Sequence, residues 1–215
     1  MLNKAFGAPL GYNVAVKEVT VIFLGPQGSG KGTQVALLKE YIGTHDTRSI
    51  VYFTAGTGLR AFAANEGYTQ EKIRPLISAG KLIPTFITTE LFSARLIGSM
   101  HGSEHVMLDG FPRTVDQIPT LDTALRFYER KDVVVLSITL SDQVARARLA
   151  SRGREDDTQE GIEERLRWSH EEAALVNEWF KNNAFYRFVE IDGEKSVEEV
   201  HRAVLEALGL SPKSA

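Results

Sequence analysis

A glycine-rich stretch, GPQGSGK at Gly25–Lys31, constrains this sequence most strongly, because it fits the spacing GxxxxGK. The run before it, Val19–Leu24, is nearly all apolar and rich in β-branched residues, which is typical of a strand buried on both faces of a parallel sheet. The residues after it, Lys31–Ile42, have helical apolar spacing, and Gly43 is the predicted end of that helix. Together they predict a phosphate-binding loop, because glycines let consecutive backbone N–H groups converge on a polyphosphate at the positive start of a helix.

Strand patterns and helix patterns alternate along the rest of the chain. Strands are predicted at 49–53, 106–108, 132–140 and 187–191, and helices at 59–65, 70–79, 86–97, 115–128, 143–150, 161–181 and 197–208. The alternation predicts an α/β fold with three α/β/α layers around a central parallel sheet. One domain is expected at 18–215, after an N-terminal extension at 1–17.

Composition excludes several classes of protein and site. The 215 residues include no cysteine, which excludes disulfides, thiolate zinc sites and a cysteine nucleophile. The net charge of -3 provides no basic field, so no nucleic-acid partner is expected. No stretch approaches the apolar length of a membrane span and the first residues resemble no targeting signal, so a cytoplasmic protein without a membrane partner is predicted.

Several segments carry a family resemblance. Gly25–Gln34 (GPQGSGKGTQ) resembles the P-loop of adenylate kinases and related nucleoside monophosphate kinases, in which GKGT is the usual ending. Leu108–Gln117 (LDGFPRTVDQ) resembles the family's LDGFPRT…Q segment and is the most specific match. Weaker matches are Gly80–Pro84 (GKLIP), 148–166 (RLASRGREDDTQEGIEERL) and, only in part, Ala55–Arg60 (AGTGLR).

The resemblance implies a fold with two small mobile parts and a reaction. The reaction is reversible phosphoryl transfer from ATP, with magnesium, to a nucleoside monophosphate. The mobile parts are a helical insertion that binds the monophosphate (NMP), at about 54–84, and a minimal lid at about 150–157. Such kinases hold magnesium largely through water and the nucleotide, so Gly32 can stand where other P-loops have a hydroxyl residue.

Residue roles follow from the same resemblance. Asp109 would hold magnesium through water; alternatively, it caps the turn that follows. Catalysis needs positioning and positive charge around the transferred group, which are assigned to Lys31, Arg113, Arg154 and Arg165. The residues implied for ATP are Gly25, Gln27, Gly28, Ser29, Gly30, Lys31, Gly32, Thr33, Arg148 and Arg152, and those for the monophosphate are Thr54, Gly56, Arg60, Ile83, Gly110, Arg113 and Gln117.

Two departures from the family pattern affect these roles. Ala55 stands in place of the family's threonine near the acceptor base, which alters recognition on that side. The lid is shorter than in short-lid relatives, so Arg148 or Arg152 could take the same role, and a zinc-bearing lid is excluded. Asp156 and Asp157 are interpreted as ion-pair partners that order the lid arginines. The two tryptophans of the long helix, Trp168 and Trp179, are interpreted as packing residues.

Three functions remain open. The first is an adenylate kinase acting as a monomer, and the second is a kinase for another monophosphate or small phosphate acceptor. The third is a P-loop nucleotide-binding protein that has lost phosphoryl transfer. It is disfavoured because a protein that only binds a nucleotide needs no arginines for the phosphates of both a donor and an acceptor. Gln117 alone selects a purine, since its amide can flip. A backbone carbonyl in Lys81–Ile83 is implied, by the resemblance, to favour adenine.

Overall fold

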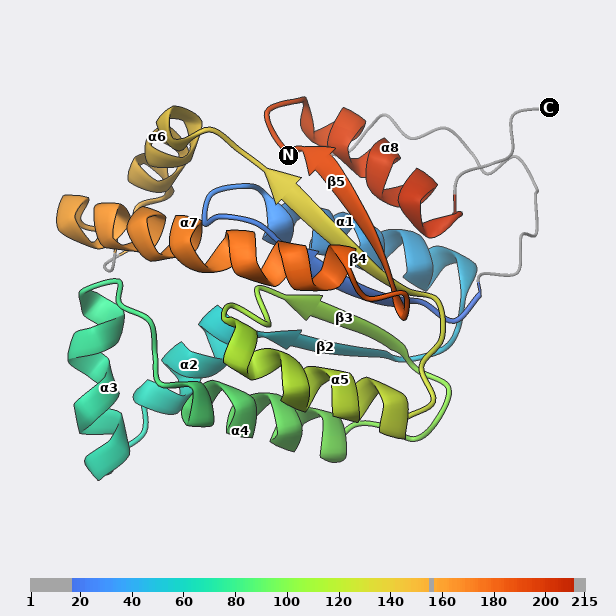
Figure 1. Cartoon of the computed structure of the whole chain (residues 1–215), viewed down its shortest axis with the longest axis horizontal. Coiled ribbons are helices and arrows are strands. Elements are labelled where there is room, and N and C mark those ends of the chain that lie inside the picture. Colours follow the sequence, from blue (N-terminus) through green and yellow to red (C-terminus); the bar gives the residue numbers. More distant parts are fainter. Residues whose placement is uncertain (1–16, 155–156, 211–215) are drawn as a thin grey trace.

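The computed structural model of this chain describes residues 17–154 and 157–210, which contain one five-stranded parallel sheet (Figure 1). In the middle of the sheet, Ile22 lies in register between Leu108 and Val135. The predicted α/β class is therefore confirmed. The strands are β1 (Thr20–Leu24), β2 (Ile50–Thr54), β3 (His105–Asp109), β4 (Val133–Thr139) and β5 (Tyr186–Asp192), in the order β2-β3-β1-β4-β5.

Helices cover both faces of the sheet, because β1 is apolar on both sides. Ile22 packs in the core cluster beneath one helical layer, and its neighbour Phe23 packs in the cluster beneath the other. Both side chains are fully buried. The first layer contains α4 (Thr85–Ile97), α5 (Ile118–Phe127) and α7 (Gln159–Lys181), and the second contains α1 (Lys31–His45) and α8 (Val197–Leu208).

Residues 55–84, here called the α2–α3 segment, lie outside these layers. The segment contains α2 (Ala55–Ala63) and α3 (Tyr68–Ser78). It has an apolar cluster of its own, formed by Leu59, Ala63, Ile73 and Ile83 with Ile87 of α4. Together with α6 (Asp142–Arg152) and the first turns of α7, the segment gathers at the end of the sheet toward which the strands point (Figure 1).

Several predicted boundaries are wrong in ways that matter for function. Helix α2 begins at Ala55 rather than Leu59, so the AGTGLR residues lie on a helix. Helix α1 continues through Gly43 to His45. Helix α6 extends to Arg152, which leaves only residues 153–158 between it and α7. A 3-10 turn, η1 (Val115–Gln117), precedes α5, so Pro119 lies in the first turn of α5 and does not bend a longer helix.

The predicted N-terminal extension lies outside the described residues except for Lys17. Within the described ranges, no helix has both the length and the apolar character required to span a bilayer.

Candidate active site

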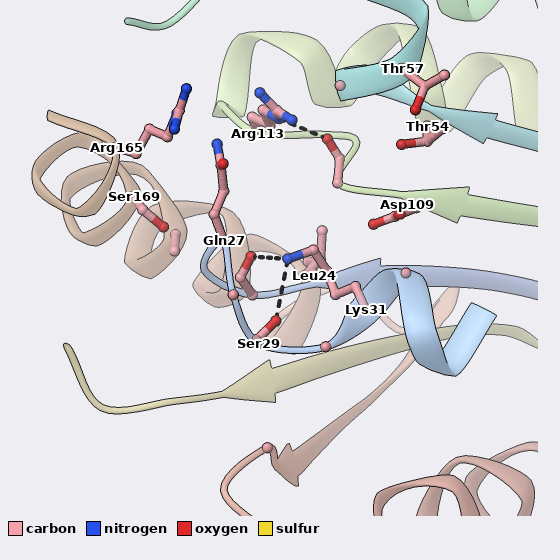
Figure 2. A pocket seen from close by; sticks show the side chains of 18 of the residues that line it. Leu24, Gln27, Ser29, Lys31, Thr54, Thr57, Asp109, Arg113, Arg165 and Ser169 are labelled. Atoms are coloured by element: carbon pink, nitrogen blue, oxygen red, sulfur yellow. Dashed lines mark hydrogen bonds between the residues drawn. The ribbon is translucent and has the colours of Figure 1, made fainter. Parts of the chain in front are cut away.

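A cavity of about 730 Å³ lies at the carboxyl ends of the strands, where parallel α/β sheets bind ligands. The P-loop, the α2–α3 segment, the turn after β3, α6 and α7 all contribute to its walls. Figure 2 shows side chains from several of these elements around the same space. The charged residues of the described chain that line it include Lys31, Asp109 and the arginines Arg60, Arg113, Arg148, Arg152, Arg154 and Arg165.

The predicted P-loop forms the floor of the cavity, and its first glycine is required for close packing. Gly25 has φ +129°, and a Cβ atom built on it would lie 2.2 Å from the carbonyl oxygen of Ile138. No other residue fits there without moving β4. Gly30, with φ +91°, precedes the first residue of α1. The first N–H groups of α1 have no partners within the helix, so they are available to an anion.

Lys31 folds back onto the loop that carries it (Figure 2). Its ammonium donates to the carbonyl oxygens of Gly25 and Pro26, at 2.8 and 2.7 Å, and lies 3.3 Å from the hydroxyl of Ser29. Loss of hydration on burial lowers the pKa of Lys31 from 10.5 to about 8, and Arg113 contributes to the shift. An anion bound in the cavity would favour the charged form.

Asp109 is the last residue of β3, as predicted, and its side chain borders the cavity. Its Oδ2 accepts a hydrogen bond of 3.2 Å from the hydroxyl of Tyr52. Burial and then the charge of Asp109 raise the pKa of Tyr52 to about 12, so the phenol stays protonated as a donor. This contact orients the carboxylate of Asp109, and no motif in the sequence singles out Tyr52.

Arg113 is anchored by the turn in which it lies. Its Nε donates to the carbonyl oxygen of Gly110 at 3.0 Å, and its backbone N–H donates to Oε1 of Gln117 at 2.8 Å. Phe111 is fully buried between Phe53 and Phe92, which attaches the turn to the core. Removal from water lowers the pKa of Arg113 to about 10.

Arg60 reaches the same place from α2. A Cβ atom built on Gly56 would lie 3.4 Å from Nη1 of Arg60 and 3.7 Å from Nη2 of Arg113. Gly56 therefore leaves room for two guanidinium groups that converge there. Thr54 and Ile83, also predicted for the monophosphate, line the cavity nearby.

The predicted base-binding residue Gln117 is placed differently. It is only 1% exposed and is not among the residues that line the cavity. Because its Oε1 accepts from the backbone of Arg113, its amide has a fixed orientation. The structure thus assigns Gln117 to holding the Arg113 turn, with Nε2 as the group left to donate.

A single carboxylate joins two of the predicted arginines. Asp157 accepts two hydrogen bonds from Arg152, at 2.8 and 2.5 Å, and one of 2.9 Å from Arg165. Burial opposes ionisation of Asp157, whose side chain is 2% exposed, but the hydrogen bonds and charge of Arg152 and the charge of Arg165 lower its pKa. The role predicted for Asp157 is confirmed, while Asp156 lies outside the described residues.

The remaining predicted arginines occupy separate positions. Arg148 lies on α6 and donates from Nη1 to the carbonyl oxygen of Gly193 at 3.0 Å, next to the P-loop residue Gly28. Arg154 lines the cavity beyond the end of α6. Arg148 and Arg152 therefore do not compete for one position, because each has its own partners.

Sequence reasoning missed the contribution of Trp168. This residue lines the cavity, whereas Trp179 packs against Phe180 and Tyr186 as expected. The sequence spacing indicates this position, because Trp168 follows Arg165 by three residues and the two therefore lie on the same face of α7.

The donor set at this edge fits a magnesium ion bound with a nucleotide. Mg²⁺ keeps several waters and takes one or two carboxylates together with substrate phosphates. Asp109 provides such a carboxylate, and bound magnesium would neutralise phosphate charge. Among the described residues, no three His, Cys, Asp or Glu side chains are grouped to hold a metal on their own. The absence of zinc stays a prediction.

Comparisons with known proteins agree with this geometry. Residues 23–185 match the family model described as adenylate kinase. The adenylate kinase of Corynebacterium urealyticum is 34% identical over 188 residues, covering 87% of this chain and 98% of that protein. The adenylate kinase of Rhodococcus erythropolis is 32% identical, with 88% and 98% covered, and that of Prochlorococcus marinus is 34% identical, with 88% and 97% covered. The chain therefore belongs to the adenylate kinase family, a family of phosphotransferases that generally use magnesium and ATP.

Proposed function

We propose that this chain transfers the terminal phosphoryl group of ATP, with magnesium, reversibly to a nucleoside monophosphate, and that AMP is the preferred acceptor. The observation that carries the proposal is the convergence on one cavity of a P-loop and of arginines from α2, the turn after β3, α6 and α7. A protein that only bound a nucleotide would need cations for one set of phosphates. This cavity has a second set of cations, Arg60 and Arg113, whose guanidinium groups converge beside Gly56. Figure 2 shows Arg113 across the cavity from Lys31 and the P-loop.

The donor phosphates belong on the P-loop. Backbone N–H groups at the start of α1 and the ammonium of Lys31 would hold them, with the proposed residues 25 and 27–33 forming the cradle. Arg148 and Arg152 flank the donor side. Asp109 would hold the magnesium ion through water.

The acceptor phosphate belongs between Arg60 and Arg113. One of its oxygens attacks the γ-phosphorus of ATP, the bond from that phosphorus to the β–γ bridging oxygen breaks, and ADP leaves with the electron pair. Arg154 and Arg165 add positive charge around the transferred group. Arginine suits these positions because its planar fork donates two parallel hydrogen bonds and stays charged.

The acceptor base is selected by fixed backbone groups more than by Gln117. Gln117 does not line the cavity and its Oε1 is occupied by the backbone of Arg113, so it gives little selection between the two purines. A carbonyl oxygen in the Lys81–Ile83 loop accepts from the amino group of adenine but opposes O6 of guanine, a mismatch of about 1–3 kcal/mol. Because Ala55 offers no hydroxyl, we expect a preference for AMP that is smaller than a full set of contacts would give.

The test compares kcat/KM for AMP, GMP, CMP and UMP with ATP as donor, following ADP formation. We expect AMP to be highest and GMP next. Higher kcat/KM for GMP or a pyrimidine monophosphate would refute the AMP preference and leave the wider kinase class. No transfer to any of the four would refute the proposal and favour a nucleotide-binding protein without transfer.

We also propose that the active form is a monomer. The cavity and its proposed ligand-binding residues all come from one chain. Light scattering during size exclusion should give the mass of one chain at concentrations that support full activity. Activity that rises with the concentration of a dimer would contradict this.

A further inference from the structure

Trp168 connects three parts of the site. Its side chain is 7% exposed and lies on α7, one turn after Arg165. Its indole Nε1 donates a buried hydrogen bond of 2.9 Å to the carbonyl oxygen of Gly80, at the end of the α2–α3 segment. The guanidinium carbon of Arg113 lies 5.7 Å from the centre of the indole ring. One side chain thus contacts both the end of α3 and an arginine of the turn after β3.

The backbone at Gly80 also approaches α7 closely. Gly80 has φ +68°, and a Cβ atom built on it would lie 2.4 Å from the carbonyl oxygen of Gly161, in the first turn of α7. A side chain here would be strained by the left-handed backbone and blocked by α7. The absence of a side chain at Gly80 is therefore what allows the hydrogen bond from Trp168.

This contact holds together two parts that are otherwise separately packed. The apolar cluster of the α2–α3 segment contains residues of α2, of α3 and of the stretch leading into α4, and no α7 residue among those described. The segment joins the sheet layers through Thr54 at one end and Pro84 at the other. A part with its own small core and a narrow contact to its neighbour can open and close as a unit.

We propose that Trp168 is a positioning residue that fastens the α2–α3 segment to α7 over a bound monophosphate and holds Arg113 toward its phosphate. The inference rests on the proposed function, because it takes the segment and Arg113 to bind the acceptor. The contact between Trp168 and Gly80 matters for covering the site, because the short connection between α6 and α7 leaves few lid residues to do so. Release of the product then requires the bond between Trp168 and Gly80 to break.

Kinetics of matched variants test the proposal. Trp168→Phe keeps an aromatic ring but leaves the carbonyl of Gly80 without its donor, so KM for AMP should rise about 5- to 100-fold while KM for ATP stays within about twofold. Trp168→Leu also removes the ring from Arg113, so in this variant kcat should fall as well, by about tenfold. Trp179→Phe is the control, because Trp179 packs in an aromatic cluster away from the cavity, and both KM values should be unchanged.

Two readouts need no catalysis. The chain has two tryptophans, so in Trp179→Phe the emission of Trp168 should change when AMP is added alone. Without nucleotide, amide exchange of residues 76–84 should be faster in Trp168→Phe than in Trp179→Phe. Unchanged exchange there, or equal rises of both KM values in Trp168→Phe, would overturn the proposal. A wild-type chain that phosphorylates no monophosphate would refute the proposed function, and the exchange measurement would still decide whether Trp168 fastens the segment.

Discussion

The protonation of Lys31 should set the alkaline limit of ATP use. Burial lowers its pKa to about 8, and its ammonium donates to carbonyl oxygens of its own loop. The last ionisation of a phosphate lies near a pKa of about 6, so about 90% of ATP carries its full charge at pH 7. Above pH 7, Lys31 is therefore the P-loop residue whose charge changes with pH.

The expected size follows from that value. With a pKa of about 8, roughly 90% of Lys31 is charged at pH 7 and roughly 10% at pH 9. ATP binds the charged form, so kcat/KM for ATP should be level below pH 8 and fall about tenfold per pH unit above it. An ordinary lysine, with a pKa of about 10.4, would give no fall below pH 9.5. Bound phosphates favour the charged form, so the fall in kcat at saturating ATP should lie at higher pH.

The assay measures kcat/KM for ATP from pH 7 to 9.5 in three proteins. Lys31→Arg keeps its charge over this range. Its kcat/KM for ATP should therefore be lower than that of the wild type but should not fall above pH 8. Lys31→Met should lose about 10²-fold or more of turnover at pH 7 while circular dichroism shows an intact fold. A flat wild-type profile, or the same step in Lys31→Arg, would refute the reasoning. Near wild-type turnover of Lys31→Met would refute the P-loop as the catalytic cradle.

Three further predictions follow from the arginine contacts and the short lid. Arg113→Lys keeps the charge but loses the planar fork, so kcat/KM for AMP should fall about 10- to 100-fold, and an unchanged value would contradict a direct phosphate contact. Asp157→Asn leaves Arg152 and Arg165 without their shared carboxylate, so the free energy of unfolding, measured in urea without nucleotide, should fall by about 3 kcal/mol. A fall below about 0.5 kcal/mol would show that these ion pairs contribute little to stability. ATP alone should release phosphate above the blank, because few lid residues exclude water, and no release would disprove this idea.

The layers of the fold were predictable from sequence, whereas the strand order and some boundaries were not. Continuous apolar strands indicate a sheet buried on both faces, and β1 is buried in that way. The order β2-β3-β1-β4-β5 depends on where each crossover returns, which periodicity does not record. The start of α2 was missed because Gly56 and Gly58 lower helix propensity by about 1 kcal/mol each. Burial of Ala55 and Leu59 accompanies the helix that forms despite this cost.

The identities of the site residues were more predictable than their partners. Motifs place Lys31, Asp109 and Arg113 at the cavity, because strand ends and a glycine loop must meet at one edge of a parallel sheet. A motif does not say what else a side chain contacts. The motif predicts that Gln117 contacts the acceptor base, which stays a prediction, but it does not predict that the Gln117 oxygen accepts from the backbone of Arg113. Trp168 looked like packing, although it lies in the wall of the cavity.

The connection between α6 and α7 shows how arginines can be positioned with very few lid residues. Helix α6 continues to Arg152, and Gly153 ends it in a left-handed conformation with φ +69°. Asp157 then pairs with Arg152 and with Arg165 of α7, whose first turn is capped by the hydroxyl of Thr158. These guanidinium groups are thus held by a carboxylate of the protein itself, so little of the free energy of nucleotide binding is needed to order them. So short a connection leaves little lid surface to exclude water, and we therefore expect the contact between the α2–α3 segment and α7 to shield the reacting phosphates.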